Sequence, residues 1–195
     1  CPAKVRASSW NQQLGLDEGP VAFGQVSSLI RRKGIDLLLK AFSMISGDYP
    51  WARLVLIGDG PENWAYRSLA ATLGIKHKVV FAGEIADPVP IYQHVVDVNV
   101  LASRSDAFPL SLLEAAACGV PSIAAAVDGI PEALTDGETG FLFDAENVEM
   151  LSQKMRVLLG TSELRSELGQ KARLDAIARF SNEKYCQSIQ RIMLE

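Results

Sequence analysis

Hydrophobic positions along the chain fall into two kinds of segment that alternate over most of its length. Short runs are apolar on both faces, as in strands buried within a parallel sheet, and longer segments repeat their apolar positions at helical spacing. This alternation predicts successive βα units, and therefore an α/β domain with a Rossmann-like parallel sheet flanked by helices. Six strands are expected, at residues 21–26, 54–57, 79–82, 98–102, 122–125 and 140–143.

Helices are expected between these strands and again at the end of the chain. Pro109 is suited to the first position of a helix, and Gly119 follows the end of the same helical pattern. After residue 145 the strand pattern stops and only amphipathic helical patterns follow. The expected helices lie at residues 34–45, 62–73, 89–94 and 110–118, followed by additional C-terminal helices at 146–159, 162–179 and 182–194.

Length and periodicity together indicate one folded domain. Residues 1–19 have mixed polarity and weak periodicity, so we expect a linker or the truncated remnant of an upstream domain. Residues 20–195 are then expected to form a single domain, whose size is in the usual range for one core.

Charge and cysteine content exclude several classes of protein. The net charge of −4 argues against a nucleic-acid partner, because such domains usually carry a basic excess. The three cysteines show neither metal-ligand spacing nor a disulfide framework, so a reducing, cytoplasmic compartment is expected and no metal is expected. We find no apolar run of the roughly 20 residues that a membrane-spanning helix needs, and no signal-peptide pattern.

Candidate chemistry lies in the loops that follow the strands, because open parallel sheets bind ligands at the carboxyl ends of their strands. The first strand ends in Gly24-Gln25-Val26, and its loop carries Arg31, Arg32 and Lys33 before a helix. A helix N-terminus already favours anions, so this loop is suited to phosphate; a solvated basic loop is the equal alternative.

The second strand ends in Ile57-Gly58-Asp59-Gly60-Pro61. Gly58 and Gly60 match the first two glycines of a dinucleotide fingerprint, but Asn63 occupies the position of the third glycine. The motif is therefore weak support for NAD. It fits either a tight turn beside a flat ligand or a plain turn between strand and helix.

Two carboxylates follow the fourth strand. Asp106 lies in its loop, and Glu114 lies eight residues later in an almost wholly apolar helical segment. A carboxylate there needs donors to offset its desolvation, and ribose hydroxyls would supply them; a basic partner would serve equally on spacing alone. After the fifth strand, the turn at Asp128-Gly129 predicts either backbone amides that meet phosphate or a helix cap by Asp128.

In their order along the chain, these loops resemble the carboxy-terminal, donor-binding domain of retaining glycosyltransferases of GT-B architecture, glycosyltransferase family 4 (group 1). The most specific piece is SRSDAFPLSLLEAAACGVP at residues 103–121, which resembles the family's acidic-x7-Glu motif and its Ala-x-x-Cys-Gly-x-Pro ending. The supporting pieces are Arg32-Lys33-Gly34, Ile57-Gly58-Asp59-Gly60-Pro61, Phe81-Ala82-Gly83-Glu84, Gly129-Ile130-Pro131-Glu132 and residues 136–142.

The resemblance implies transfer of a sugar from a nucleoside diphosphate sugar to an acceptor hydroxyl, with retention of configuration and without a metal. It makes residues 20–195 a nucleotide-sugar-binding domain. It assigns two residues to catalysis, Lys33 at the donor diphosphate and Asp106 at the transferred sugar alone, and it assigns the ribose to Glu114. The remaining donor-binding residues that it implies are Gly24, Gln25, Arg31, Arg32, Gly58, Gly60, Phe81, Gly83, Glu84, Pro109, Leu110 and Ser111, of which residues 81–84 would meet the base. Gln25 occupies the place where the family commonly has arginine, in a loop about two residues longer than usual, so Arg31 or Arg32 is expected to replace that arginine.

By the same resemblance, the chain is only the donor-binding half of a longer enzyme of polysaccharide or glycolipid biosynthesis. A glycan, lipid or small-molecule acceptor would bind mainly to the absent amino-terminal domain, in the cytoplasm or peripherally at the cytoplasmic membrane. A GT-B-like nucleotide-sugar epimerase, a dinucleotide-dependent oxidoreductase and a non-catalytic nucleotide-sugar-binding domain remain the alternatives.

Overall fold

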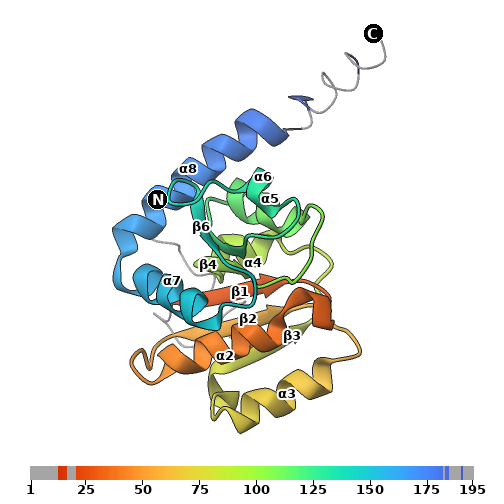
Figure 1. Cartoon of the computed structure of the whole chain (residues 1–195), viewed down its shortest axis with the longest axis vertical. Coiled ribbons are helices and arrows are strands. Elements are labelled where there is room, and N and C mark those ends of the chain that lie inside the picture. The colour runs from red at the N-terminus through yellow and green to blue at the C-terminus, as the bar shows by residue number, and fades with distance from the viewer. Residues whose placement is uncertain (1–12, 17–20, 182, 185–189, 191–195) are drawn as a thin grey trace.

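The computed structural model describes residues 13–16, 21–181, 183–184 and 190 of the chain. Within them, all six predicted strands form and pair in parallel in one sheet (Figure 1). The fold class predicted from the alternating pattern is therefore confirmed. The strands are β1 (Ala22–Val26), β2 (Arg53–Ile57), β3 (Val79–Gly83), β4 (Val98–Leu101), β5 (Ser122–Ala125) and β6 (Gly140–Phe143).

The strand order is β3-β2-β1-β4-β5-β6. The chain builds outward from β1 in one direction, then returns to place β4 on the other side of β1, where Phe23 pairs with Val98. Reversal of the strand order leaves a crevice outside the carboxyl ends of β1 and β4, the usual ligand position in this topology. The loops after these two strands carry Lys33 and Asp106.

Most of the expected helices form, with ends shifted by one or two residues. The helices are α2 (Ile35–Ser46), α3 (Asn63–Thr72), α4 (Val89–His94), α5 (Leu110–Ala117), α6 (Ile130–Ala133), α7 (Val148–Gly160) and α8 (Ser162–Phe180), with 3-10 turns at Arg31–Lys33 and Lys76–Lys78. The helix expected at 182–194 lies almost wholly outside the described residues.

The start of one helix, and the place of Pro109 relative to another, differ from expectation for reasons of backbone geometry. Gly34 has a φ of 66°, a left-handed conformation that cannot continue a helix, so α2 begins at Ile35. Pro109 has a ψ of 116° and therefore lies one residue before the helix, which makes Leu110 the first helical residue of α5.

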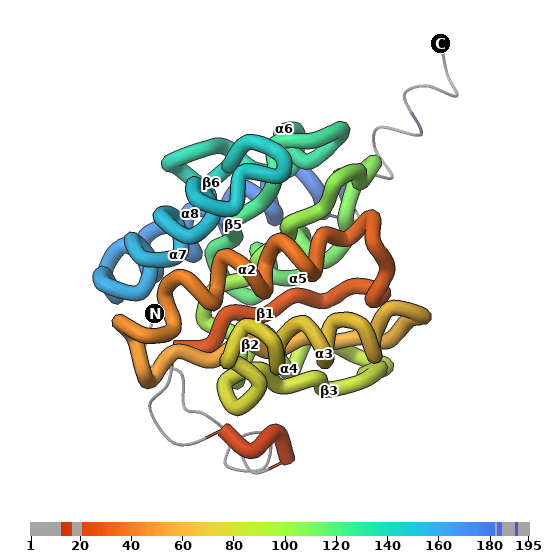
Figure 2. The backbone as a smooth tube through the Cα atoms, turned by 60° about the horizontal axis from the view of Figure 1, so that its bottom comes forward, coloured from red at the N-terminus to blue at the C-terminus, as the bar shows by residue number. Residues whose placement is uncertain are grey.

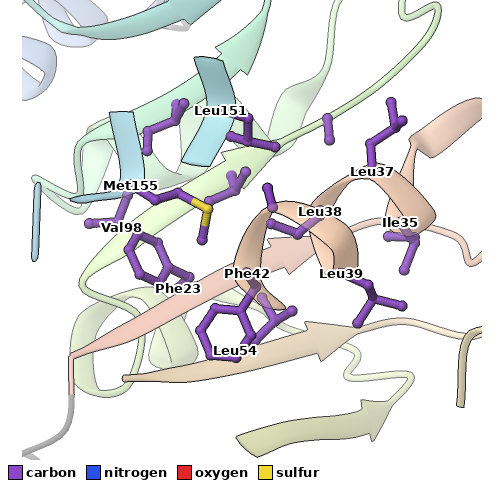
Figure 3. Close-up of a cluster of buried hydrophobic side chains, with 14 of the residues drawn as sticks. Phe23, Ile35, Leu37, Leu38, Leu39, Phe42, Leu54, Val98, Leu151 and Met155 are labelled. Atoms are coloured by element: carbon purple, nitrogen blue, oxygen red, sulfur yellow. The ribbon is translucent and has the colours of Figure 1, made fainter. Parts of the chain in front are cut away.

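Helices cover both faces of the sheet (Figure 2). On one face, α2, α3 and α7 bury the larger apolar cluster, in which the rings of Phe23 and Phe42 meet edge to face with centroids 6.4 Å apart (Figure 3). On the other face, α4 and α5 pack against β1 and β2 around the buried Ile91 and Tyr92. With both faces covered, the open carboxyl edge is where loop side chains can meet a ligand.

Candidate functional site

Three loops at the carboxyl edge of the sheet are packed backbone against backbone, and glycines make this possible. A Cβ atom on Gly34 would lie 1.8 Å from the carbonyl oxygen of Ala102, and one on Gly129 would lie 1.8 Å from that of Ala107. Neither contact can be relieved by a side-chain rotation, because the obstructing atoms belong to the backbone. The loops after β1 and β5 are thereby held against the loop after β4.

Lys33 and Asp106 meet across the switch point between β1 and β4. The Lys33 Nζ atom donates to Asp106 Oδ2 at 2.5 Å, and the two side chains are 15% and 9% exposed. Because both side chains are little exposed, water screens the attraction between their charges only weakly. Leaving either charge unpaired at this position would be costly. The structure thus brings together the two residues that the resemblance assigned to catalysis, and Asp106 already has a partner other than a sugar.

Arg104 holds the two loops that carry this pair. Its guanidinium bonds both carboxylate oxygens of Asp36 at 2.8 Å and also bonds the Arg31 carbonyl oxygen at 2.9 Å and Glu146 at 2.7 Å. The hydrogen bond to Asp36, together with the bond to Glu146 and the charges of both carboxylates, outweighs burial and raises the pKa of Arg104 above its ordinary value. The sequence motif contained Arg104 without assigning it a role. Its position as a basic residue in the loop after a buried strand was the signal that could have indicated one.

Asp128 fixes the Asp106 loop from the opposite side. One of its carboxylate oxygens accepts from the Ser105 hydroxyl at 2.7 Å and from the Asp106 backbone N–H at 2.8 Å. Asp128 has a φ of 45°, which is uncommon outside glycine. A cap on its own helix, one of the two alternatives for this turn, is not formed, since α6 starts without a side-chain cap hydrogen bond from the described residues. Its carboxylate instead anchors the neighbouring loop.

Two residues expected to bind the donor lie inside β1 and serve the fold. A Cβ atom on Gly24 would lie 2.3 Å from the Val96 side chain, so this glycine permits close packing of β1 against the segment that follows α4. Gln25 is 1% exposed, and its amide nitrogen donates to the Lys33 carbonyl oxygen at 2.8 Å and to the Ser27 hydroxyl at 3.2 Å. Gln25 therefore lies beneath the basic loop, whereas the resemblance had placed it against the donor.

An open hollow of about 500 Å³ lies at the carboxyl ends of β1, β2 and β3. Gly58 and Glu84 line it together with Ser27, and Gly83 ends β3 directly before it. Gly58 has a φ of 125°, and a Cβ atom there would lie 2.1 Å from the Ser27 carbonyl oxygen. We call this space the carboxyl-edge hollow. Gly60 is absent from its lining and instead packs against the Leu29 backbone.

Glu114 lines a second hollow, of about 450 Å³, between α4, α5 and the end of α8. Its lining is mainly apolar and includes Val89 and Leu113. Burial, with a smaller contribution from the charge of Asp87, raises the pKa of Glu114 above its ordinary value. This confirms the expectation of a carboxylate in apolar surroundings, a state that a hydrogen-bond donor would stabilise.

The other predicted site residues lie in different places. Phe81 faces α3, with the Arg67 guanidinium 4.4 Å from its ring centroid, and it lines neither of the hollows described above. Arg31 and Arg32 are exposed in a 3-10 turn, and Arg32 donates to the Ser105 carbonyl oxygen at 3.0 Å. At the start of α5, Pro109 is buried, Leu110 is 67% exposed and Ser111 is half-buried.

The described residues contain neither a metal-binding cluster nor a membrane-spanning helix. No group of three or more His, Cys, Asp and Glu side chains among them is arranged to hold a metal ion. No helix in this part of the chain is both long enough and apolar enough to cross a membrane.

The fold and its carboxyl-edge loops define a Rossmann-like domain of GT-B type, and solved structures of that architecture superpose on it. A sequence profile described as "Glycosyl transferases group 1" matches residues 7–175, and the chain belongs to this family. The family predicted by resemblance is therefore confirmed.

Relatives of known activity show how much of a longer protein the chain represents. It is 33% identical over 173 residues to N-acetyl-alpha-D-glucosaminyl L-malate synthase of Bacillus anthracis, covering 89% of this chain and 45% of that protein. It is 31% identical over 166 residues to the GDP-mannose-dependent alpha-(1-6)-phosphatidylinositol monomannoside mannosyltransferase of Mycolicibacterium smegmatis, covering 81% and 43%. The chain spans about half the length of these relatives and matches their carboxy-terminal part.

Solved structures give the same proportion. HepE of Anabaena in complex with UDP and glucose superposes with a TM-score of 0.87 at 24% identity, over 100% of this chain and 53% of that one. Sucrose-phosphate synthase of Thermosynechococcus elongatus superposes with a TM-score of 0.83 at 27% identity, over 96% and 48%.

Proposed function

We propose that this chain is the donor-binding half of a glycosyltransferase that moves a sugar from a nucleoside diphosphate sugar to an acceptor hydroxyl with retention of configuration. The observation that carries the proposal is the Lys33–Asp106 pair at the switch point. In this crevice, a cation can bind a diphosphate and a carboxylate can bind the hydroxyls of a sugar attached to it. The UDP and glucose bound to HepE support a donor of this class.

In the proposed complex, the base occupies the carboxyl-edge hollow beside Gly58 and Glu84. Glu114 accepts hydrogen bonds from the ribose, which offsets the cost of burying its charge. The diphosphate lies against Lys33, and Asp106 orients the transferred sugar. The acceptor, whether a glycan, a lipid or a small molecule, would bind mainly outside this chain.

The reaction places additional negative charge on the departing diphosphate, and Lys33 stabilises that charge. Its ammonium lies just before α2, whose N-terminal amides favour anions in the same region. Pre-organised charge of this kind contributes several kcal/mol to transition states, on the order of 3 kcal/mol for one donor. In the free protein Asp106 neutralises Lys33, so donor binding must exchange that carboxylate for phosphate oxygens.

The exchange gives a test on Asp106→Asn, which keeps the shape of the side chain and removes its charge. Affinity for the bare nucleoside diphosphate should rise, because Lys33 is released from its ion pair. The additional affinity contributed by the sugar should fall, because an orienting acceptor is lost. Calorimetry with UDP, GDP and ADP and with their sugar conjugates measures both quantities, and equal losses for both ligand types would contradict the assignment.

Glu114→Ala should behave differently from Asp106→Asn in the same titrations. Loss of hydrogen bonds to ribose should cost about 1 to 3 kcal/mol for the nucleoside diphosphate and for its sugar conjugate alike. The stereochemistry is tested separately, by the anomeric configuration of the product made by the full-length enzyme. An inverted product, or no affinity of the wild-type protein for any nucleotide sugar, would overturn the proposal.

A further inference from the structure

A third hollow, of about 520 Å³, lies along α3 and the edge strand β3, and the proposed function leaves it unused. Figure 1 shows α3 at the lower end of the domain. Its lining includes Trp64, Arg67, Ser68, Ala71, Lys76 and Phe81. We call this space the α3 groove; none of its lining residues lines the carboxyl-edge hollow. Phe81, which the family motif assigned to the base, opens into the α3 groove instead.

The α3 groove belongs to a basic segment of an acidic chain. Residues 63–83 contain Arg67, Lys76 and Lys78 and no Asp or Glu, although the net charge of the chain is −4. Among the described residues, no carboxylate lies within ion-pair distance of Arg67 or Lys76. The guanidinium of Arg67 lies over the Phe81 ring and is held there by a 2.7 Å bond from its Nε to Asn63. Two cations are therefore available to anionic groups of a ligand.

The lining of the groove includes an exposed aromatic side chain. Trp64 is 80% exposed, the most exposed large apolar side chain among the described residues. One exposed apolar side chain is ordinary on its own, but this one adjoins a hollow whose wall is formed by the small residues Ser68 and Ala71. An indole offers a flat apolar face and one N–H donor, which match the C–H face and the hydroxyls of a sugar ring.

We propose that the α3 groove binds an anionic carbohydrate, with a sugar ring on Trp64 and acidic groups at Arg67 and Lys76. Arg67 lies in the second turn of α3, whereas Lys76 lies beyond the end of the helix. The cations therefore follow one another along the groove, which suits charges spread over an elongated ligand better than a single phosphate. Trp64 is the only large apolar side chain of this lining that is exposed, whereas docking on a lipid surface needs a broader apolar face.

The test is titration of the chain with a sulfated oligosaccharide and with a neutral dextran fragment of equal length. The sulfated ligand should bind, and Trp64→Ala, Arg67→Gln and Lys76→Gln should each weaken it about five- to tenfold. Each lysine or arginine variant should also flatten the dependence of affinity on salt, because one fewer charge contact is made. The three side chains are exposed, so melting temperatures should stay at the wild-type value.

Matched controls come from similar residues elsewhere. Lys154→Gln removes a cation from the ring of Phe141, where Nζ lies 4.6 Å from the centroid, and Trp51→Ala removes a tryptophan that is 49% exposed. Both variants should bind the sulfated ligand as the wild type does, and the groove variants should keep the wild-type affinity for UDP. Four results would overturn the proposal: equal binding of dextran, equal losses in the controls, UDP binding lost with Trp64, or capture of phosphatidylglycerol vesicles that depends on Trp64.

Discussion

The two parts of the candidate donor site are built in opposite ways. At the switch point, charged side chains fix the structure, since Lys33 pairs with Asp106 and Arg104 joins the loops that carry them. In the carboxyl-edge hollow, close backbone packing fixes the structure, and Gly58 has no space for a side chain. A single substitution can therefore remove one charge at the switch point selectively, whereas a substitution at Gly58 would move the backbone of two loops.

The largest effect should follow from Lys33→Met. The variant lacks the ammonium proposed to meet the diphosphate and leaves the nearly buried Asp106 without its ion-pair partner. Affinity for a nucleoside diphosphate should fall by about 1.5 to 3 kcal/mol, the range for hydrogen bonds to charged groups, with almost no change for the uncharged nucleoside. Isothermal titration with both ligands measures the difference, and Lys40→Met, an exposed lysine on α2, is the control. Equal losses for nucleoside and nucleotide would place the diphosphate elsewhere.

Arg104→Ala should have the next largest effect, on stability. It removes both bonds to Asp36 and the bonds to Glu146 and the Arg31 carbonyl oxygen. We expect the free energy of unfolding to fall by about 2 kcal/mol, because these are charge-assisted bonds at only 21% side-chain exposure. Urea denaturation measures this loss, and Arg156→Ala, whose partner Asp48 is 62% exposed, should cost far less.

The same variant should alter the acid limb of the stability profile. Burial acts to raise the pKa of Asp36, but the Arg104 bonds and charge outweigh it and hold the pKa below its ordinary value of 3.8. A depressed carboxyl pKa stabilises the fold above the unfolded value, and that stability is lost as the pH falls through the folded value. Arg104→Ala should therefore lose less stability than the wild type when the pH is lowered below about 4. An unchanged acid limb would show that Arg104 does not set this pKa.

Sequence reasoning predicted the sheet and the apolar surroundings of Glu114, because both signals are local. Apolar strands such as residues 122–125 show their burial in their own composition, and Glu114 differs visibly from its apolar neighbours. The sequence did not show which way individual side chains face. Phe81 and Glu84 are close in sequence, yet they line hollows on different parts of the domain. Strand alternation turns Phe81 toward α3, and only the finished sheet shows which face that is.

Contacts between loops were equally invisible in the sequence. Asp128 and Asp106 are 22 residues apart, and their contact exists only because β4 and β5 are neighbours. Gly24 and Gln25 were assigned to the donor because they come near the end of a strand. The structure places both within β1, where the tight packing against Val96 and the bond to the Lys33 carbonyl explain them.

A smaller effect should come from Glu114→Gln, in which stability and binding change in opposite directions. Burial raises the folded pKa of Glu114 above its ordinary 4.5, so the folded state binds more protons than the unfolded state at pH values just above 4.5. Stability contributed by this group is present at low pH and is lost as the pH rises through that window. The variant should melt at a higher temperature than the wild type at pH 7 while binding nucleoside diphosphates more weakly. A lower melting temperature would indicate that Glu114 has a stabilising partner within the fold.

The smallest effect should come from Gln25→Leu, which separates residues that support the charged loop from residues that meet a ligand. The substitution removes the donors to the Lys33 carbonyl and the Ser27 hydroxyl, but it also removes Gln25 Oε1, a buried acceptor without a hydrogen-bond partner. These contributions oppose each other, so the free energy of unfolding should change by less than about 1 kcal/mol. Because the side chain is 1% exposed beneath the loop, nucleotide affinity should stay close to that of the wild type. A loss as large as that of Lys33→Met, with stability unchanged, would mean that the loop opens on binding and exposes Gln25 to the donor.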